Sequence, residues 1–256
     1  VNRVSLGVQS FSAAFRACIG RHTPLPNMSE RIKRLHAAGI GNLGIDLIYA
    51  IPGQGLTEWR EELSRACDLG VSHLSTYALT HEEGTRLVQR SVPVPDEDTV
   101  ADLWEATEET VSSAGLQRYE ISNLALPGWE CRHNDAVWHG ASYLGLGPAA
   151  ASFDGRDRWT QPADLHRWLA RATATLDRLP TAARAAEILA FGLRTARGWP
   201  IAEFATRTGF DPFALRGETL GRLTKVGLLE NTATPPTLRP TRRGMLFHDD
   251  IAAELL

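Results

Sequence analysis

Two polar residues stand inside segments that otherwise read as buried β-strands. Asp46 lies within GIDLIYAIPG, and Gln9 ends the apolar run VSLGVQ. Because side chains alternate between the faces of a strand, Asp46 shares its face with Gly44 and Ile48. A buried carboxylate needs a hydrogen-bonding or charged partner, and an amide can both donate and accept. Both residues therefore suit a pocket for a polar ligand; a purely structural role is the alternative for each.

Three glycines mark joins between a helix end and a strand. Gly39, Gly70 and Gly115 each precede a run rich in β-formers and suit the left-handed residue that ends many helices. With the opening run, they predict strands alternating with helices, near residues 4–8, 43–49, 73–79 and 118–122. Such alternation is typical of parallel strands with right-handed crossovers. Four units make half of a (β/α)₈ barrel, so we expect an α/β fold with a partial, open TIM-like barrel, the second half only.

Apolar residues at helical spacing predict the helices between these strands. One helix carries Trp59, Leu63 and Ala66, with Thr57 as its expected N-cap. After Pro148 the pattern changes to helical stretches, then two short strands around a Pro-containing loop, then a terminal helix. This order is typical of a winged-helix-like module. We therefore expect two domains: residues 1–150, the half barrel, and residues 151–256, a mainly helical C-terminal domain.

Composition sets limits on the function. The formal net charge is -3, and the apolar runs are much shorter than the about 20 residues of a membrane span. We expect a soluble protein of the cytoplasm. The cysteines are spaced too widely for a disulfide framework or a metal-binding loop; they are Cys18, Cys67 and Cys131. Residues 151–256 hold 15 Lys and Arg against 12 Asp and Glu, so a solvated surface is favoured over a DNA-binding face.

Two loops carry further candidates. Arg21 precedes a Pro-rich turn, on the side where the first strand ends, and could bind a carboxylate bidentately. The stretch GWECRHNDAVWHG places His133 and His139 beside Trp138. A neutral imidazole can ligate haem iron, and an aromatic ring can form a wall for a macrocycle. A solvated arginine and an ordinary structural loop are the alternatives.

Several stretches in order resemble the HemW-type haem chaperones, radical S-adenosylmethionine (SAM) proteins related to the oxygen-independent coproporphyrinogen III oxidases. They are VNRVSLGVQSF, GIDLIYAIPGQ, LSTYALTHEEGT, YEISNLALPGWECRHN, YLGLGP and LRPTRRG. The resemblance implies a partial barrel that holds SAM and a [4Fe-4S] cluster, followed by a winged-helix-like part. It implies SAM contacts by Gln9, Arg21 and Asp46, with Thr80 lining the same pocket.

The resemblance also implies haem binding. The HemW group has an HNxxYW motif connected with haem, which makes His133 the candidate iron ligand and Trp138 part of the surroundings of the ring. Here the motif reads HNDAVW, so Val137 stands where the family has Tyr. The missing phenol leaves the environment of the ring open.

The chain departs from the family in the loop that ligates the cluster. The CxxxCxxC motif does not occur in the sequence, so we expect no [4Fe-4S] ligands in this chain and no radical catalysis by it. The opening run VSLGV also lacks the residues that protect exposed sheet edges. Both features predict that further strands and the cluster loop precede Val1 in the intact protein.

The predicted function is that of a haem chaperone, which binds haem and transfers it to an acceptor protein of unknown identity. One alternative is an oxygen-independent coproporphyrinogen III oxidase, which decarboxylates propionate side chains through SAM radical chemistry. A second alternative is a nucleic-acid-binding module built on the winged-helix-like tail, whose affinity would fall steeply with salt.

Overall fold

The computed structural model describes residues 1–81, 86–89, 92–93 and 95–256. The chain forms two compact units, Val1–Glu130 and Cys131–Leu256. The division into domains of residues 1–150 and 151–256 remains a prediction. In the part of the chain that the structure describes, no helix combines the length and apolar character that crossing a membrane requires.

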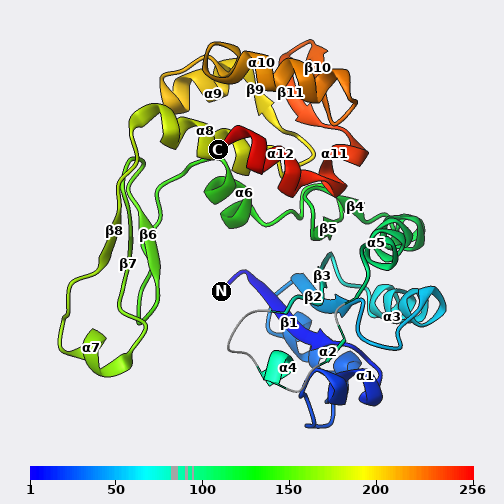
Figure 1. Cartoon of the computed structure of the whole chain (residues 1–256). Coiled ribbons are helices and arrows are strands. Elements are labelled where there is room, and N and C mark those ends of the chain that lie inside the picture. The colour runs from blue at the N-terminus through cyan, green and yellow to red at the C-terminus, as the bar shows by residue number, and fades with distance from the viewer. Residues whose placement is uncertain (82–85, 90–91, 94) are drawn as a thin grey trace. The chain divides into compact units, whose positions relative to one another are not determined.

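The first unit contains a five-stranded sheet with strand order β1-β2-β3-β5-β4, accompanied by helices (Figure 1). Its elements are β1 (Arg3–Gln9), α1 (Ala13–Cys18), α2 (Met28–Ala37), β2 (Asn42–Tyr49), α3 (Leu56–Asp68), β3 (His73–Ala78), α4 (Arg86–Gln89), α5 (Glu97–Val111), η1 (Ser112–Ala114), β4 (Gln117–Arg118) and β5 (Asn123–Ala125).

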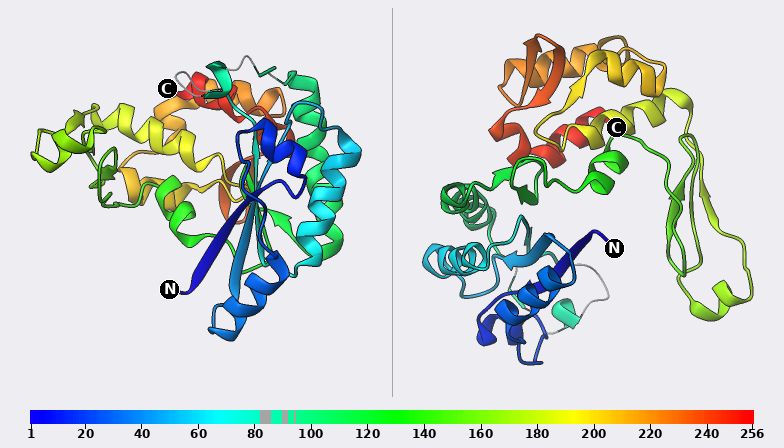
Figure 2. Two further views of the ribbon diagram at one scale, coloured as in Figure 1. Left: turned by 90° about the horizontal axis from the view of Figure 1, so that it is seen from below. Right: turned by 180° about the vertical axis from the view of Figure 1, so that it is seen from behind.

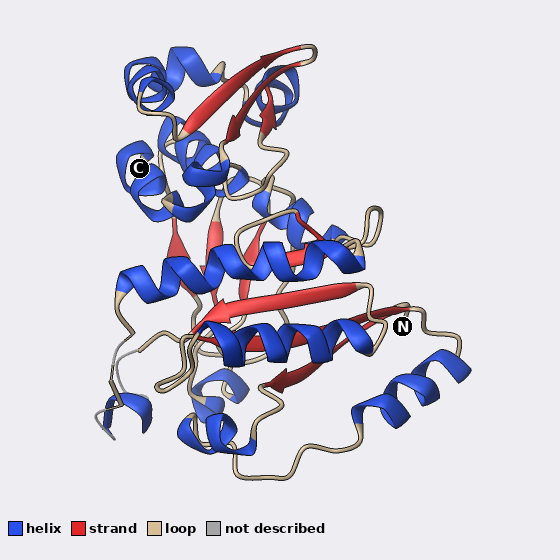
Figure 3. Ribbon diagram, turned by 90° about the vertical axis from the view of Figure 1, so that its right-hand side faces the viewer, coloured by secondary structure: helices blue, strands red, loops and turns tan. Residues whose placement is uncertain are grey.

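One face of this sheet forms the core of the first unit. Leu43, Ile45 and Leu47 alternate along β2 and are almost fully buried. Helices α3 and α5 pack side by side (Figure 3). The Trp59 ring of α3 lies 5.4 Å from the Tyr49 ring of β2, and its Nε1 donates to Thr107 Oγ1 of α5 at 2.9 Å. The apolar face of β2 thus meets α3, which leaves the face of Gly44 and Asp46 for other contacts.

The predicted joins are confirmed, and two local predictions are wrong. Gly39, Gly70 and Gly115 take φ values of 80°, 68° and 77°, and β1, β2 and β3 are parallel. The fourth strand is only Gln117–Arg118 instead of residues 118–122. It is not the next parallel neighbour, because β5 is inserted between β3 and β4 and runs antiparallel to both. Thr57 is not an N-cap, since α3 begins at Leu56 after Gly55, where Glu58 Oε2 accepts from the Gly55 N–H.

The second unit carries two antiparallel three-stranded sheets, of strand order β6-β7-β8 and β10-β11-β9. The second of these sheets lies beside α9 and α10 (Figure 2). The elements are α6 (Arg132–Trp138), β6 (Ala151–Phe153), β7 (Arg158–Thr160), α7 (Leu165–Leu169), β8 (Thr175–Asp177), α8 (Thr181–Gly192), β9 (Trp199–Pro200), α9 (Ile201–Thr208), α10 (Pro212–Lys225), β10 (Leu229–Ala233), β11 (Pro236–Pro240), α11 (Arg242–Leu246) and α12 (His248–Leu255).

The core of the second unit is built around α8. Trp199 and Phe204 are fully buried in it, with leucines of α8, α10 and β11. The two strands expected around the Pro-containing loop are confirmed as the β10–β11 hairpin. The prediction of a single terminal helix is wrong, because the segment is interrupted at Phe247 and forms two helices, α11 and α12.

Candidate functional site

Asp46 and Gln9 come together around Gly7 on the polar face of the parallel strands. Gly7 of β1 pairs with Asp46 of β2, and Gln9 Nε2 lies 2.9 Å from the position that a Cβ on Gly7 would occupy. Ser5 Oγ donates a hydrogen bond of 2.6 Å to Asp46 Oδ1. Any side chain at Gly7 would displace the Gln9 amide. The glycine therefore makes room for the Gln9 amide beside the strand position that pairs with Asp46.

The backbone at Gln9 is held in an uncommon conformation. The register of β1 and β2 shifts between Gly7 and Gln9, and Gln9 takes a φ of 67°, in the left-handed region that few residues other than glycine adopt. Buried Glu62 of α3 fixes the turn that follows: its carboxylate accepts from Ser10 Oγ at 2.7 Å and from the Phe11 N–H at 2.6 Å. The position of Gln9 thus depends on a carboxylate in a neighbouring helix.

The polar face continues across β3. Ser75 pairs with Asp46, and His73, two residues earlier on β3, pairs with Gly44. The buried His73 ring has its Nδ1 3.4 Å from the Cβ position of Gly44. His73 Nε2 lies 2.9 Å from Tyr119 Oη. Among the described residues, Nδ1 has no hydrogen-bond partner.

Burial and, to a smaller degree, the positive charge of Arg3 lower the pKa of His73 to about 3. His73 is therefore neutral at physiological pH. Sequence reasoning missed this residue, although the alternation of His73, Ser75 and Tyr77 in HLSTY is the same signal that identified Asp46.

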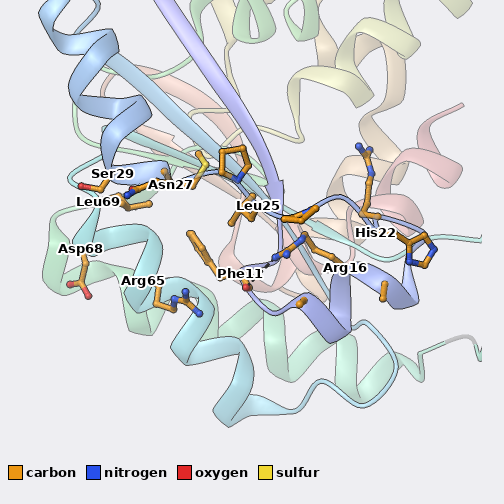
Figure 4. A pocket seen from close by; sticks show the side chains of 15 residues that line it. Phe11, Arg16, His22, Leu25, Asn27, Ser29, Arg65, Asp68 and Leu69 are labelled. Carbon is orange, nitrogen blue, oxygen red and sulfur yellow. Dashed lines mark hydrogen bonds between the residues drawn. The ribbon is translucent and has the colours of Figure 1, made fainter.

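Arg21 and Thr80 lie elsewhere in the first unit. A cavity of about 740 Å³ lies between α1, α2, α3 and the loop before α2, with Phe11, Arg16 and Arg65 in its wall (Figure 4). Arg21 is among its lining residues, whereas Gln9 and Asp46 are not. Thr80 is exposed, two residues beyond the end of β3. Because β1 and β3 are parallel, Thr80 and Gln9 lie at the same edge of the sheet.

The two histidines near Trp138 have opposite environments. His139 is buried: its Nδ1 lies 2.8 Å from the Asp135 carbonyl oxygen and its Nε2 lies 3.1 Å from that of Gly198. Its ring packs edge-on against Trp199, with centroids 4.6 Å apart. His133 of α6 is exposed, and its ring has no hydrogen-bond partner within the described ranges. Of these two histidines, His133 is the one whose imidazole is open to a ligand from solution.

Helix α6 is anchored by Asp135. Burial alone would raise the pKa of this carboxyl, but hydrogen bonds and charges from His139 and Arg197 outweigh it and lower the pKa. Arg197 Nε donates to Asp135 Oδ1 at 3.2 Å, and Arg197 Nη1 donates to Glu203 of α9 at 3.0 Å. The helix that carries His133 is thus tied to α9 by charged groups.

Trp138 lines a second cavity, of about 320 Å³. The guanidinium of Arg194 lies 4.8 Å from the centroid of the Trp138 ring. The walls of the cavity come from α6, α8 and the first two strands of the β6-β7-β8 sheet: Val137, Trp138, Gly140, Tyr143, Phe153, Arg158, Glu187, Ile188 and Phe191.

The described residues do not fit a metal cluster. In these ranges no group of three or more His, Cys, Asp or Glu side chains is arranged to hold a metal ion, and Cys18 and Cys67 are free thiols. A [4Fe-4S] cluster needs several thiolates that converge. The described residues therefore offer no ligand set for such a cluster.

Comparisons with known proteins agree on one group. Residues 179–247 match the family model "HemN C-terminal domain". A protein named "Heme chaperone HemW" from Lactococcus lactis is 32% identical, over 90% of this chain and 63% of that protein. Its namesake from Mycobacterium tuberculosis is also 32% identical, over 99% of this chain and 65% of that protein. The chain therefore spans less than two thirds of the length of these relatives.

A solved structure has the same fold. The coproporphyrinogen III oxidase HemN from Escherichia coli, described as a radical SAM enzyme, matches with a TM-score of 0.79 and 19% identity, over 99% of this chain and 64% of that chain. The chain shares the α/β fold of HemN, and the sequence matches identify it as a HemW-type protein.

Proposed function

We propose that the chain binds haem through His133 and passes it to an acceptor protein. The observation that carries this proposal is the contrast between the two histidines near Trp138: His139 is buried against two carbonyl oxygens, whereas His133 is exposed on a helix that is anchored by Asp135. A neutral imidazole is a competent haem ligand. The name "heme chaperone" of the relatives supports the same ligand.

We also propose that Gln9 and Asp46 contact SAM, and that Thr80 lines the same pocket. The Gln9 amide over Gly7, and the carboxylate of Asp46, the residue that pairs with Gly7, support a polar ligand at this place on the sheet. Arg21 would join this site only if its side chain turned away from the cavity that it lines. The [4Fe-4S] cluster that accompanies SAM in radical SAM enzymes would need ligands from outside the described residues.

The finer architecture is also a proposal. We infer that β1, β2 and β3 belong to an open, partial βα barrel, and that the β10-β11-β9 sheet with α9 and α10 is winged-helix-like. The parallel order of the strands and the β10–β11 hairpin support this assignment. We place the protein in the cytoplasm.

Haem titration tests the main proposal. Wild-type protein and His133→Ala are titrated with haem while the Soret band is followed, with His166→Ala, an exposed histidine of α7, as the matched control. We expect a shifted Soret band in the wild type and the control, and its loss in His133→Ala. The same band in His133→Ala would overturn the assignment. SAM-dependent decarboxylation of coproporphyrinogen would instead favour the oxidase, the activity in the name of the structural relative.

A further inference from the structure

The cavity beside Trp138 has the size of part of a tetrapyrrole. Its volume of about 320 Å³ is at the lower end of the range of small-molecule sites, about 300–1,000 Å³. A pyrrole ring with its substituents fits such a volume, whereas the whole macrocycle does not. A porphyrin could therefore insert one edge, with its metal outside.

The cavity lies next to the exposed histidine. His133 and Val137 are four residues apart on α6, so they share one face of the helix, with Cβ atoms about 5–6 Å apart. Val137 forms part of the cavity wall. A flat ligand whose metal is bound by His133 thus has an apolar wall one helical turn away.

The charged groups in the cavity wall are already paired. Arg158 donates two hydrogen bonds to the Glu187 carboxylate, at 3.0 Å and 2.8 Å, and Arg184 donates a further hydrogen bond to Glu187. Arg158 Nη1 also donates to Asp177 Oδ2 at 3.3 Å. A ligand carboxylate would lose its water without gaining a vacant cationic partner, which is costly.

The remaining wall is mostly apolar, with aromatic rings of Tyr143, Phe153 and Phe191 around Ile188. We propose that this cavity binds a carboxylate-free porphyrin edge, which bears methyl and vinyl groups, and thereby selects porphyrins that have such an edge. Protoporphyrin IX has two neighbouring rings without propionate. Coproporphyrin III carries a propionate on every pyrrole ring and has no such edge. This inference rests on the proposed function for the position of the metal, which His133 would bind. Binding of the porphyrin ring in the cavity does not depend on His133.

Metal-free porphyrins provide the test, because they bind without an iron ligand. Protoporphyrin IX and coproporphyrin III are titrated into the protein and followed by fluorescence. We expect protoporphyrin to bind at least about tenfold more tightly. Equal affinities, or a preference for coproporphyrin, would overturn the proposal.

Two matched variants locate the effect. Phe191→Asp places a carboxylate in the cavity wall and should weaken protoporphyrin binding by about tenfold. Phe213→Asp on α10 is the control, since Phe191 and Phe213 are 41% and 40% exposed, and it should leave the affinity unchanged. Circular dichroism checks that both variants are folded. An unchanged affinity in Phe191→Asp, or an equal loss in Phe213→Asp, would contradict the assignment.

His133→Ala separates this inference from the proposed function. The variant should keep the preference for metal-free protoporphyrin while it loses the haem Soret band. If the band survives but the preference and the Phe191→Asp effect hold, only the iron ligand is wrong. If the band is lost as expected but the preference is absent, only the cavity assignment fails.

Discussion

Ser5 Oγ of β1 donates a hydrogen bond of 2.6 Å to Asp46 Oδ1 of β2. Ser5 lies two residues before Gly7, the residue that pairs with Asp46. The bond fixes one carboxylate oxygen and leaves the second oxygen for another partner. Because Gly7 has no side chain, the Gln9 amide lies over this glycine, with Nε2 2.9 Å from the position that a Gly7 Cβ would occupy. The arrangement holds a negative charge and an amide at one place, which suits a ligand with hydroxyl or ammonium groups.

The first prediction concerns this carboxylate. Asp46→Ala should weaken SAM binding by about 10- to 100-fold, because a hydrogen bond to a charged group contributes about 1.5–3 kcal/mol. Ser5→Ala should weaken it less, since Asp46 keeps its charge but loses its fixed orientation. Isothermal titration calorimetry with SAM measures both. Asp102→Ala, an exposed carboxylate of α5, is the control. Equal SAM affinity in Asp46→Ala and wild type would remove the site assignment.

The second prediction concerns Glu62, which positions Gln9 from a distance. Its buried carboxylate accepts from Ser10 Oγ and from the N–H groups of Phe11 and Ser12. Glu62→Ala leaves these donors without an acceptor and should lower the free energy of unfolding by about 2–3 kcal/mol. Urea denaturation followed by circular dichroism measures the loss. Glu61→Ala, its exposed neighbour, should change stability by less than about 0.5 kcal/mol. Equal losses in the two variants would show that the turn does not depend on Glu62.

Sequence patterns predicted the parallel part of the fold. The glycine joins at Gly39 and Gly70 follow from the left-handed helix cap, and the period of two in β2 follows from burial of one face. The inserted strand β5 could not be predicted, because Asn123–Ala125 is only three residues long and its antiparallel pairing with β3 depends on contacts distant in the sequence. Short strands carry too few residues to show a period.

The candidate sites were predictable only in part. A lone Asp or Gln in an apolar run is visible in the sequence, and so is a histidine beside a tryptophan. The different environments of His133 and His139 are not visible, because the partner of His139 Nε2 is the carbonyl oxygen of Gly198, far along the chain. The same holds for Glu62. In the sequence it is an ordinary helix residue, because its partners Ser10 and Phe11 are distant along the chain.

The third prediction concerns pH and His73. The folded protein keeps His73 neutral down to about pH 3, whereas the unfolded chain binds a proton near the ordinary pKa of about 6.5. Between these values the unfolded state binds more protons. The stability that neutral His73 contributes is therefore full above about pH 6.5 and is lost as the pH falls toward 3. At pH 5 the loss is about 2 kcal/mol.

Urea unfolding at pH 7.5 and pH 5, in wild type and His73→Gln, measures this term. The wild type should lose about 2 kcal/mol more than the variant on acidification. Burial also lowers the pKa of His248, so both proteins should keep a residual pH dependence, and the difference between them isolates His73. The same acid sensitivity in both proteins would mean that His73 is not held neutral in the fold.

The fourth prediction separates the roles of the two histidines. His139 contacts the carbonyl oxygens of Asp135 and Gly198 and packs on Trp199, so His139→Ala should lower the free energy of unfolding by about 1–3 kcal/mol. His133→Ala should leave stability within about 0.5 kcal/mol, because its exposed ring makes no hydrogen bond in the described part of the chain. Thermal unfolding of the two variants makes the comparison. A larger loss in His133→Ala would show that His133 has a structural role.

The fifth prediction concerns the charged cluster that links β7 to α8. Glu187 of α8 binds Arg158 of β7 and Arg184 of its own helix, and Arg184 is 3% exposed. Removal of one partner from a buried ion pair leaves an uncompensated charge, which costs about 3–5 kcal/mol. Glu187→Ala should therefore destabilise the second unit by about 3 kcal/mol and expose the β6-β7-β8 sheet to proteolysis.

A double-mutant cycle gives the sharper result for this cluster. If the cost in Glu187→Ala comes from the guanidiniums left behind, then replacing Arg158 as well should recover part of it, so that Glu187→Ala with Arg158→Leu is more stable than Glu187→Ala alone. Glu203→Ala, which breaks a half-exposed pair with Arg197, should cost less than about 1 kcal/mol. Additive losses in the cycle would mean that the two side chains stabilise the unit through separate contacts. The charge pairing that excludes ligand carboxylates from the cavity would then lack its energetic basis.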